Sequence, residues 1–195
     1  VFSLIDGDKE KKTDNYLLFY GIENIKTEYI EKCNNYHIPY SVIVKKQNSN
    51  LNEWVSVYIT LNKEKPDAII LHSITLIIVS LVYKLTHLKT KLIIVEHNAN
   101  SIKRKSEWLW SFLSLLFSDW VVYLTETYKS ELRKKFSFFS YRNAKVIPNG
   151  INLSVYLPDN TPKHDGFRLT MISRFTKFRD HKTLISACQK CLGKI

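Results

Sequence analysis

The feature that most restricts the fold is a series of short apolar runs, each bounded by turn or helix signals. Clear examples are Ala68–Leu71, Lys91–Val95 and Trp120–Thr125. Strands that are apolar at nearly every position, instead of every second one, are typical of parallel sheets covered by helices on both faces. The amphipathic segments between these runs predict right-handed βαβ crossovers. We therefore expect an α/β fold built on an open, mostly parallel sheet.

The same pattern predicts the other elements. Further strands are expected over Val1–Ile5, Tyr16–Tyr20, Tyr40–Val44 and Val146–Ile147, and helices over Ile25–Asn34, Trp54–Lys63, Ile74–Leu85 and Glu126–Phe136. The longest apolar stretch, from Ala68 to Tyr83, contains His72 and other polar residues and is shorter than the roughly 20 residues of a membrane-spanning helix. We therefore reject a transmembrane interpretation.

The net charge of +11 is concentrated in the second half of the chain. Residues 1–100 carry 12 basic and 11 acidic side chains, so residues 101–195 hold almost the whole positive excess. This asymmetry favours an anionic partner, such as a nucleotide diphosphate or an anionic lipid. We do not expect nucleic acid, because the basic residues are scattered through apolar elements and no nucleic-acid-binding motif accompanies them.

The three cysteines are too few and too spread out for a disulfide framework, which favours a reducing, cytosolic setting. Cys188 and Cys191 have the spacing of a metal or redox pair, but no second pair completes a zinc site. The same spacing places two neighbours on one face of a helix, and we favour that packing role over a metal site. No metal site is therefore predicted.

Residues 146–187 contain two motifs in a fixed order. Val146-Ile147 is followed by the turn Pro148-Asn149-Gly150 and a linker that reaches Pro158. A strand over Phe167–Ser173 then leads through a loop with Arg174 and Arg179 into a helix. Such an arrangement is typical of a strand leaving one domain and a strand–loop–helix unit opening another, with cationic side chains where α/β sheets bind anions.

This stretch resembles the domain junction of the retaining GT-B glycosyltransferases of family 4 (glycosyl transferases group 1). The family writes V-I-P-N-G-I-D, then F or Y, then P, where this chain has VIPNGINLSVYLP, with Asn152 in place of the acid. Downstream, the family's G-R-L, K-G-H and L-I-x-A match Ser173-Arg174-Phe175, Arg179-Asp180-His181 and Leu184-Ile185-Ser186-Ala187.

The resemblance implies a GT-B fold and a division into three parts. Residues 1–150 correspond to an N-terminal, acceptor-side Rossmann-like domain that lacks its first strand and the glycine-rich loop after it. Residues 151–166 correspond to the interdomain linker, and residues 167–195 to the start of the C-terminal, nucleotide-sugar-binding domain. We expect a chain truncated at both ends, ending before the family's paired glutamates, and inactive by itself.

His97 is the candidate catalytic residue. Ligands of open parallel sheets bind beyond the carboxyl ends of the strands, where His72 and the run Glu96-His97-Asn98 fall. In the family, a polar residue at the position of His97 lies close to the transferred sugar, so the resemblance gives His97 a sugar contact, with Glu96 and Asn98 as supports. The alternative for His97, and the one favoured for His72, is a structural histidine at a strand end.

Arg174 and Arg179 are the candidate donor-binding residues. Their guanidinium groups match phosphate oxygens and stay charged, so both can stabilise a leaving diphosphate without a metal. The family has Arg and Lys here. Asn149 and Gly150 are interpreted as hinge or donor contacts at the crossing, with Gly150 supplying the positive φ that the turn requires. The alternative for the arginines is a solvated loop.

The stretch Lys103-Arg104-Lys105 precedes a Trp-rich apolar segment over residues 108–117. A helix of this composition fits contact with anionic lipid, yet Trp108, Phe112, Leu115 and Leu116 also share one face, as in a core helix. Both interpretations stay open.

The resemblance as a whole implies a retaining hexosyltransferase of cell-surface polysaccharide synthesis. The donor is a nucleotide-diphosphate sugar, the acceptor is a glycan or a lipid-linked molecule, and no further cofactor is expected. The expected location is the cytoplasm, including the inner face of the cell membrane. The alternative is a non-catalytic module of the same fold that binds a membrane or a protein partner.

Overall fold

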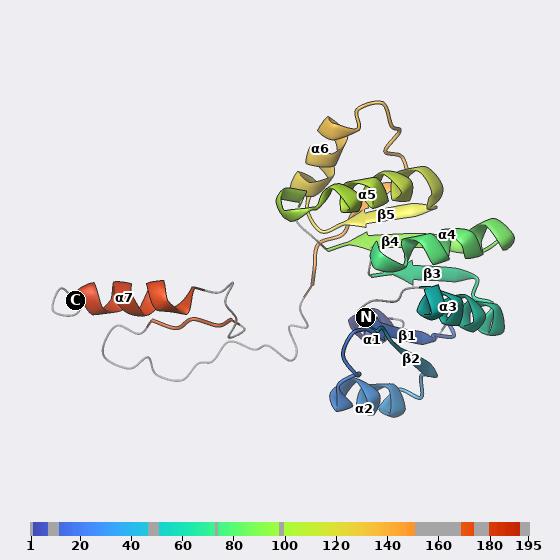
Figure 1. Ribbon diagram of the computed structural model, residues 1–195, viewed down its shortest axis with the longest axis horizontal. Coiled ribbons are helices and arrows are strands. Elements are labelled where there is room, and N and C mark those ends of the chain that lie inside the picture. Colours follow the sequence, from blue (N-terminus) through green and yellow to red (C-terminus); the bar gives the residue numbers. More distant parts are fainter. Residues whose placement is uncertain are drawn as a thin grey trace. The chain divides into compact units, whose positions relative to one another are not determined.

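The computed structural model describes residues 2–7, 12–46, 51–72, 74–97, 100–150, 169–173 and 180–191. The chain forms two compact units, Val1–Asn152 and Leu153–Ile195. Each unit is described by itself, and Figure 1 labels their elements.

The first unit alternates helices and strands along the chain (Figure 1). Its elements are α1 (Phe2–Gly7), β1 (Leu17–Gly21), α2 (Thr27–Asn35), β2 (Tyr40–Val44), α3 (Leu51–Glu64), β3 (Ala68–Leu71), η1 (Ile74–Leu76), α4 (Ile77–Thr86), β4 (Lys91–Glu96), η2 (Asn100–Ile102), α5 (Lys105–Phe117), β5 (Trp120–Tyr123), α6 (Glu126–Lys135) and β6 (Ala144–Val146). The predicted α/β fold with parallel strands is confirmed.

The strands form two parallel sheets within this unit. β1 pairs with β2, and a second sheet has the order β3-β4-β5-β6. The register places Leu71 beside Ile94 and Glu96 beside Tyr123. Because all four strands of the second sheet run in the same direction, their carboxyl ends lie at one edge.

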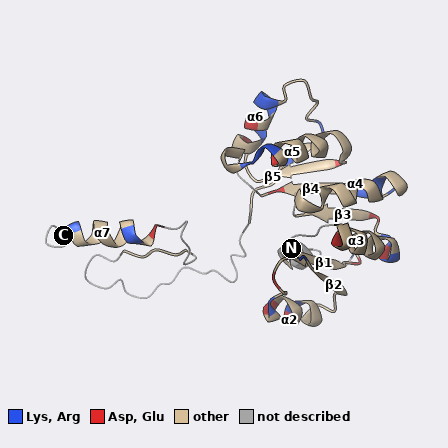
Figure 2. Cartoon of the chain, in the orientation of Figure 1, with Lys and Arg blue, Asp and Glu red and all other residues tan. Residues whose placement is uncertain are grey.

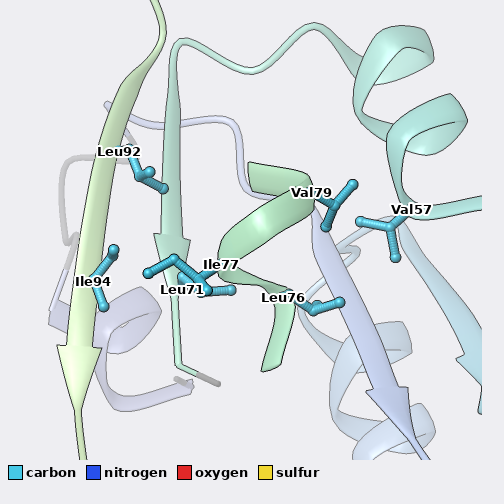
Figure 3. Packing of buried hydrophobic residues seen from close by; sticks show 7 residues of the cluster. All are labelled: Val57, Leu71, Leu76, Ile77, Val79, Leu92 and Ile94. Atoms are coloured by element: carbon cyan, nitrogen blue, oxygen red, sulfur yellow. The ribbon is translucent and has the colours of Figure 1, made fainter. Parts of the chain in front are cut away.

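A shared hydrophobic core joins the two sheets. Its buried members come from α3, β3, η1, α4 and β4, and Figure 3 shows them packed together: Val57, Leu71, Leu76, Ile77, Val79, Leu92 and Ile94. Leu18 and Tyr20 of β1 and Ile43 of β2 pack against this cluster. The two sheets are therefore held together by side-chain packing, although no backbone pairing between β1 and β3 is present in the described residues.

A second cluster surrounds β5. It consists of Leu115 from α5, Val121 and Tyr123 from β5, Leu132 from α6 and Ala144 from β6. α5 and α6 are thereby fixed to the sheet that carries His97.

The predicted strand over Val1–Ile5 is wrong. Residues 2–7 form α1, and the ring of Phe2 lies 6.2 Å from that of Tyr29 and 6.0 Å from that of Tyr36 (centroid distances). A short apolar run has no periodicity that separates a strand from a helix, so packing against these aromatic rings decides its structure.

The burial of β3 and β4 also differs from the expected pattern. Leu92, Ile94 and Glu96 are buried, whereas Ile93 and Val95 between them are only half-buried and Ile70 is 49% exposed. The face of β4 that carries Leu92 and Ile94 is therefore covered, and the opposite face is covered only in part. Several apolar residues of the two runs stay partly exposed in this unit.

The second unit contains α7 (His181–Cys191). Leu169–Ser173, expected at the end of a strand, has no regular secondary structure, and Ile172 is 95% exposed. A strand needs a paired neighbour, and the described part of this unit contains none. Of the two cysteines on α7, Cys188 is half-buried and Cys191 is exposed, and both are free. No helix among the described residues is long and apolar enough to cross a membrane.

Candidate active site

The candidate site lies at the carboxyl edge of the sheet β3-β4-β5-β6. His72 follows β3 directly, His97 follows β4 directly, and Asn149 and Gly150 lie beyond β6. Open parallel sheets bind their ligands beyond this edge, outside the carboxyl ends of the strands.

His72 and His97 form a hydrogen-bonded pair. Nδ1 of His72 lies 3.0 Å from Nε2 of His97, and the rings meet edge to edge, with centroids 5.3 Å apart and an interplanar angle of 26°. His97 is exposed and His72 is half-buried. Burial, and then the proximity of His97, lowers the pKa of His72 below its usual value. The structure thus brings His72 to the residue that the sequence had singled out.

Glu96 points into the protein and not toward the site. Its carboxylate forms an ion pair with Lys103, and the two side chains are only 3% and 2% exposed. Lys103 Nζ also donates to Ser111 Oγ at 2.9 Å. The ion pair joins Glu96, at the end of β4, to Lys103, seven residues further along the chain, so Glu96 supports the site through the backbone.

Lys103 is the supporting residue that the sequence did not reveal. With Arg104 and Lys105 it belongs to the basic stretch for which lipid contact was one interpretation, but its side chain is buried and its ammonium lies 5.3 Å from the ring centroid of Trp108. One lysine among three consecutive basic residues carries no sequence signal of burial, because the burial of Lys103 depends on its ion pair with Glu96.

Tyr123 is the last residue of β5 and lies beside Glu96, its partner in the register of β4 and β5. Its hydroxyl is fully buried, and burial followed by the charge of Glu96 raises its pKa above the usual value. Within the described residues neither this hydroxyl nor Oε1 of Glu96 has a hydrogen-bond partner. Tyr123 therefore stays protonated and neutral next to the ion pair.

Asn149 and Gly150 are exposed in the structure. The expected positive φ at Gly150 is not found, and a Cβ placed there would contact no atom within 4 Å. The backbone at this position therefore needs no glycine, and the roles of Asn149 and Gly150 as hinge or donor contacts stay predictions.

Arg174 and Arg179 lie outside the described residues, as does Asn98, so their roles also stay predictions. The neighbouring Asp180, which replaces the family's glycine, has a defined role at the start of α7. Its Oδ1 accepts from the backbone N–H of Thr183 at 3.0 Å, and Oδ2 from the hydroxyl of Thr183 at 2.5 Å. Asp180 therefore caps the helix that follows the predicted phosphate-binding loop.

Among the described residues, no three His, Cys, Asp or Glu side chains lie close enough together to hold a metal ion. The two histidines supply two ligands at most, fewer than the three or four protein ligands of a typical zinc site.

Comparisons with solved structures identify the fold. Three crystal structures of Anabaena Alr3699/HepE resemble the chain, each with a TM-score of 0.56: the complex with UDP and glucose (14% identity), the complex with UDP (12%) and the complex with UDP-glucose (13%). The alignments cover 74%, 75% and 75% of this chain but only 39%, 47% and 47% of those chains. The chain thus spans less than half the length of these proteins and shares the Rossmann-like fold of a GT-B glycosyltransferase.

The sequence comparisons identify the family. None of the curated protein sequences compared with the chain matches it. The model of Glycosyltransferase Family 4 matches residues 20–155, a range that includes all six strands in whole or in part, the histidine pair and the Pro148-Asn149-Gly150 turn. Because this match spans more than half of the 195 residues, the chain belongs to Glycosyltransferase Family 4.

Proposed function

We propose that this chain is part of a glycosyltransferase that moves a hexose from a nucleotide-diphosphate sugar to a glycan or lipid-linked acceptor, with retention of configuration, in the synthesis of a cell-surface polysaccharide. The observation that carries the proposal is the pair of His72 and His97 at the carboxyl edge of two neighbouring parallel strands, within a chain of this family. The UDP and UDP-glucose complexes of the similar Anabaena proteins support a nucleotide sugar as donor.

His97 is the residue that contacts the sugar in this proposal. It is exposed at the site edge, while the Glu96–Lys103 ion pair fixes the backbone on either side of it. An imidazole nitrogen held in place can orient a sugar hydroxyl and keep the anomeric carbon aligned with the acceptor.

The leaving nucleotide diphosphate develops negative charge as the glycosidic bond to the donor breaks. We assign Arg174 and Arg179 to this charge, because guanidinium groups pair with phosphate oxygens in a bidentate geometry.

We further propose that the protein acts at the cytoplasmic face of the cell membrane, with the start of α5 in contact with anionic lipid. Lys and Arg residues lie at the start of α5 and along α6 (Figure 2). Near the start of α5, Ile102 is 70% exposed and Leu109 is 51% exposed, and Arg104 and Lys105 are exposed too. Apolar side chains flanked by cations suit an interfacial position, while Leu115 on the same helix belongs to the core.

The test of the enzymatic proposal is a transfer and donor-hydrolysis assay on the whole protein that contains this chain, with a panel of nucleotide sugars. We expect turnover of one donor and its loss in His97→Ala, Arg174→Ala and Arg179→Ala, each checked for retained folding. The anomeric configuration of the product, read by NMR, tests retention. Absence of both turnover and nucleotide binding would overturn the proposal and favour the non-catalytic binding module.

The lipid contact is tested by co-sedimentation with vesicles of phosphatidylcholine alone or mixed with phosphatidylglycerol. We expect binding only to the anionic vesicles, weakened by salt and by Leu109→Gln. Leu85→Gln is the matched control, since Leu85 is 68% exposed on α4. Equal losses in both variants would contradict a contact through the start of α5.

A further inference from the structure

The contact between His72 and His97 determines more than the position of the two rings. A hydrogen bond between two imidazoles requires one nitrogen that carries a proton and one with a free lone pair. At 3.0 Å, the Nδ1 of His72 and the Nε2 of His97 must therefore divide these roles between them.

The surroundings favour His72 as the acceptor. His72 is half-buried, and its burial, together with the neighbouring His97, lowers its pKa and keeps it neutral at physiological pH. A neutral imidazole whose proton is on Nε2 offers the lone pair of Nδ1. His97, which is exposed, then donates from its Nε2.

We infer that His72 is a positioning residue that holds His97 with its proton on Nε2 and leaves Nδ1 as the nitrogen with which His97 contacts a substrate. In its neutral form His97 then accepts a hydrogen bond at Nδ1. The ligand it fits is a sugar that presents a hydroxyl donor at that point, and a deoxy sugar without this hydroxyl leaves Nδ1 unpaired. The assignment of the sugar rests on the proposed function, but the proton position does not.

The ring geometry strengthens the inference. The interplanar angle of 26° and the centroid distance of 5.3 Å, with 3.0 Å between the nitrogens, place the two rings edge to edge on neighbouring strand ends, so the hydrogen bond lies close to both ring planes. The Glu96–Lys103 ion pair restrains the backbone next to His97, so the ring is fixed both from its own strand and from the neighbouring one.

The proton position is measured by ¹⁵N NMR of the chain labelled at histidine, at neutral pH. We expect His97 to show a protonated Nε2 and an unprotonated Nδ1. In His72→Phe, which keeps an aromatic ring but removes the acceptor, both nitrogens of His97 are expected to shift toward the average of two exchanging tautomers. His72→Asn, whose amide oxygen is at a comparable distance from the backbone, is expected to restore the original signals.

His87→Asn is the matched control. The ring of His87 stacks on that of Tyr83, with centroids 4.1 Å apart. His87 lies after α4 and makes no hydrogen bond to His97. Its replacement should leave the His97 signals unchanged. Identical His97 signals in the wild type and in a folded His72→Phe, or a wild-type His97 protonated on Nδ1 and not on Nε2, would overturn the inference. If His72→Phe does not fold, His72→Ala, which also removes the acceptor, takes its place and is judged by the same outcomes.

A second readout connects the proton position to catalysis in the whole protein. We expect His72→Phe to lower kcat by about 10-fold, which is the smaller effect seen when a metal-binding histidine loses the partner that orients it. KM should change little, and His72→Asn should restore kcat. An unchanged kcat in an active protein would overturn the positioning role. A confirmed proton position in a protein that transfers no sugar would instead refute the proposed function and leave the assignment of the proton intact.

Discussion

The carboxylate of Asp119 accepts a hydrogen bond from the backbone N–H of Leu92, with 2.9 Å between Oδ2 and N. The same carboxylate pairs with Lys84 of α4 and, at 3.1 Å, with Lys91 of β4. A single side chain in the turn before β5 therefore joins a helix and the start of a neighbouring strand at the edge of the sheet opposite the candidate site.

This arrangement predicts a loss of stability in acid. Partial burial acts to raise the pKa of Asp119, but the hydrogen bonds from Lys84, Leu92 and Lys91 outweigh it and lower the pKa to about 2. Because the folded-state pKa is depressed, the contribution is fully present above about pH 4, the unfolded value, and disappears as the pH falls toward 2. Asp119→Asn is expected to cost roughly 1–2 kcal/mol at pH 7 and much less at pH 2, measured by urea denaturation. Asp67→Asn, at an exposed carboxylate, is the control, and parallel acid losses in the wild type and Asp119→Asn would contradict the prediction.

Lys103→Met is expected to destabilise the protein by about 3–5 kcal/mol, because it leaves the carboxylate of Glu96 buried without its partner. The double variant Glu96→Gln with Lys103→Met should recover a large part of this loss. Lys32→Met tests an exposed ion pair with Glu28 on α2 and should leave the free energy of unfolding nearly unchanged, because water screens the two charges. If the double variant loses as much unfolding free energy as the two single variants together, the two charges act independently.

Leu92→Ala is expected to cost about 2–5 kcal/mol of unfolding free energy, because Leu92 is fully buried in the core shared by the two sheets. Leu88→Ala, at a residue 77% exposed, removes the same atoms from the surface and should have little effect. Chemical denaturation followed by far-UV circular dichroism measures both. Equal effects would mean that the core around Leu92 is loosely packed.

Asp180→Ala is expected to loosen the first turn of α7, because it removes both hydrogen bonds to Thr183. These hydrogen bonds lower the pKa of Asp180, so the cap is in place above about pH 4 and is lost in more acidic solution. Hydrogen exchange should show several-fold faster exchange at the backbone amide of Thr183 in the alanine variant, whereas Asp180→Asn should stay close to the wild type. Unchanged exchange in Asp180→Ala would refute the cap.

The sequence predicted most of the elements of the first unit, and the reasons are visible in particular residues. β4 was predicted from Lys91–Val95 because each residue of the run but the first is apolar, and α6 was predicted as the helix over Glu126–Phe136. The role of Thr125 as the cap of α6 was not predicted, because the sequence placed Thr125 at the end of the preceding strand. α1 was missed because its structure depends on the contact of Phe2 with rings of α2, which no local pattern encodes.

The candidate site was predicted in part. The positions of His72 and His97 at strand ends followed from the sequence, but their hydrogen bond depends on β3 and β4 being neighbours in one sheet. The inward direction of Glu96 depends on the alternation of side chains along β4 and on the buried ammonium of Lys103. Both are properties of tertiary packing, which short-range patterns do not specify.

The separation of β1 from β3 has a consequence for how the chain behaves in solution. In the part of the chain that the structure describes, each of these two strands uses only one side for backbone pairing. The other side presents amide and carbonyl groups that match any extended segment, whether from elsewhere in the same protein or from a second molecule. Self-association through these two strands should therefore rise steeply with protein concentration, and a lysine or proline introduced on β3 is where we would begin to suppress it.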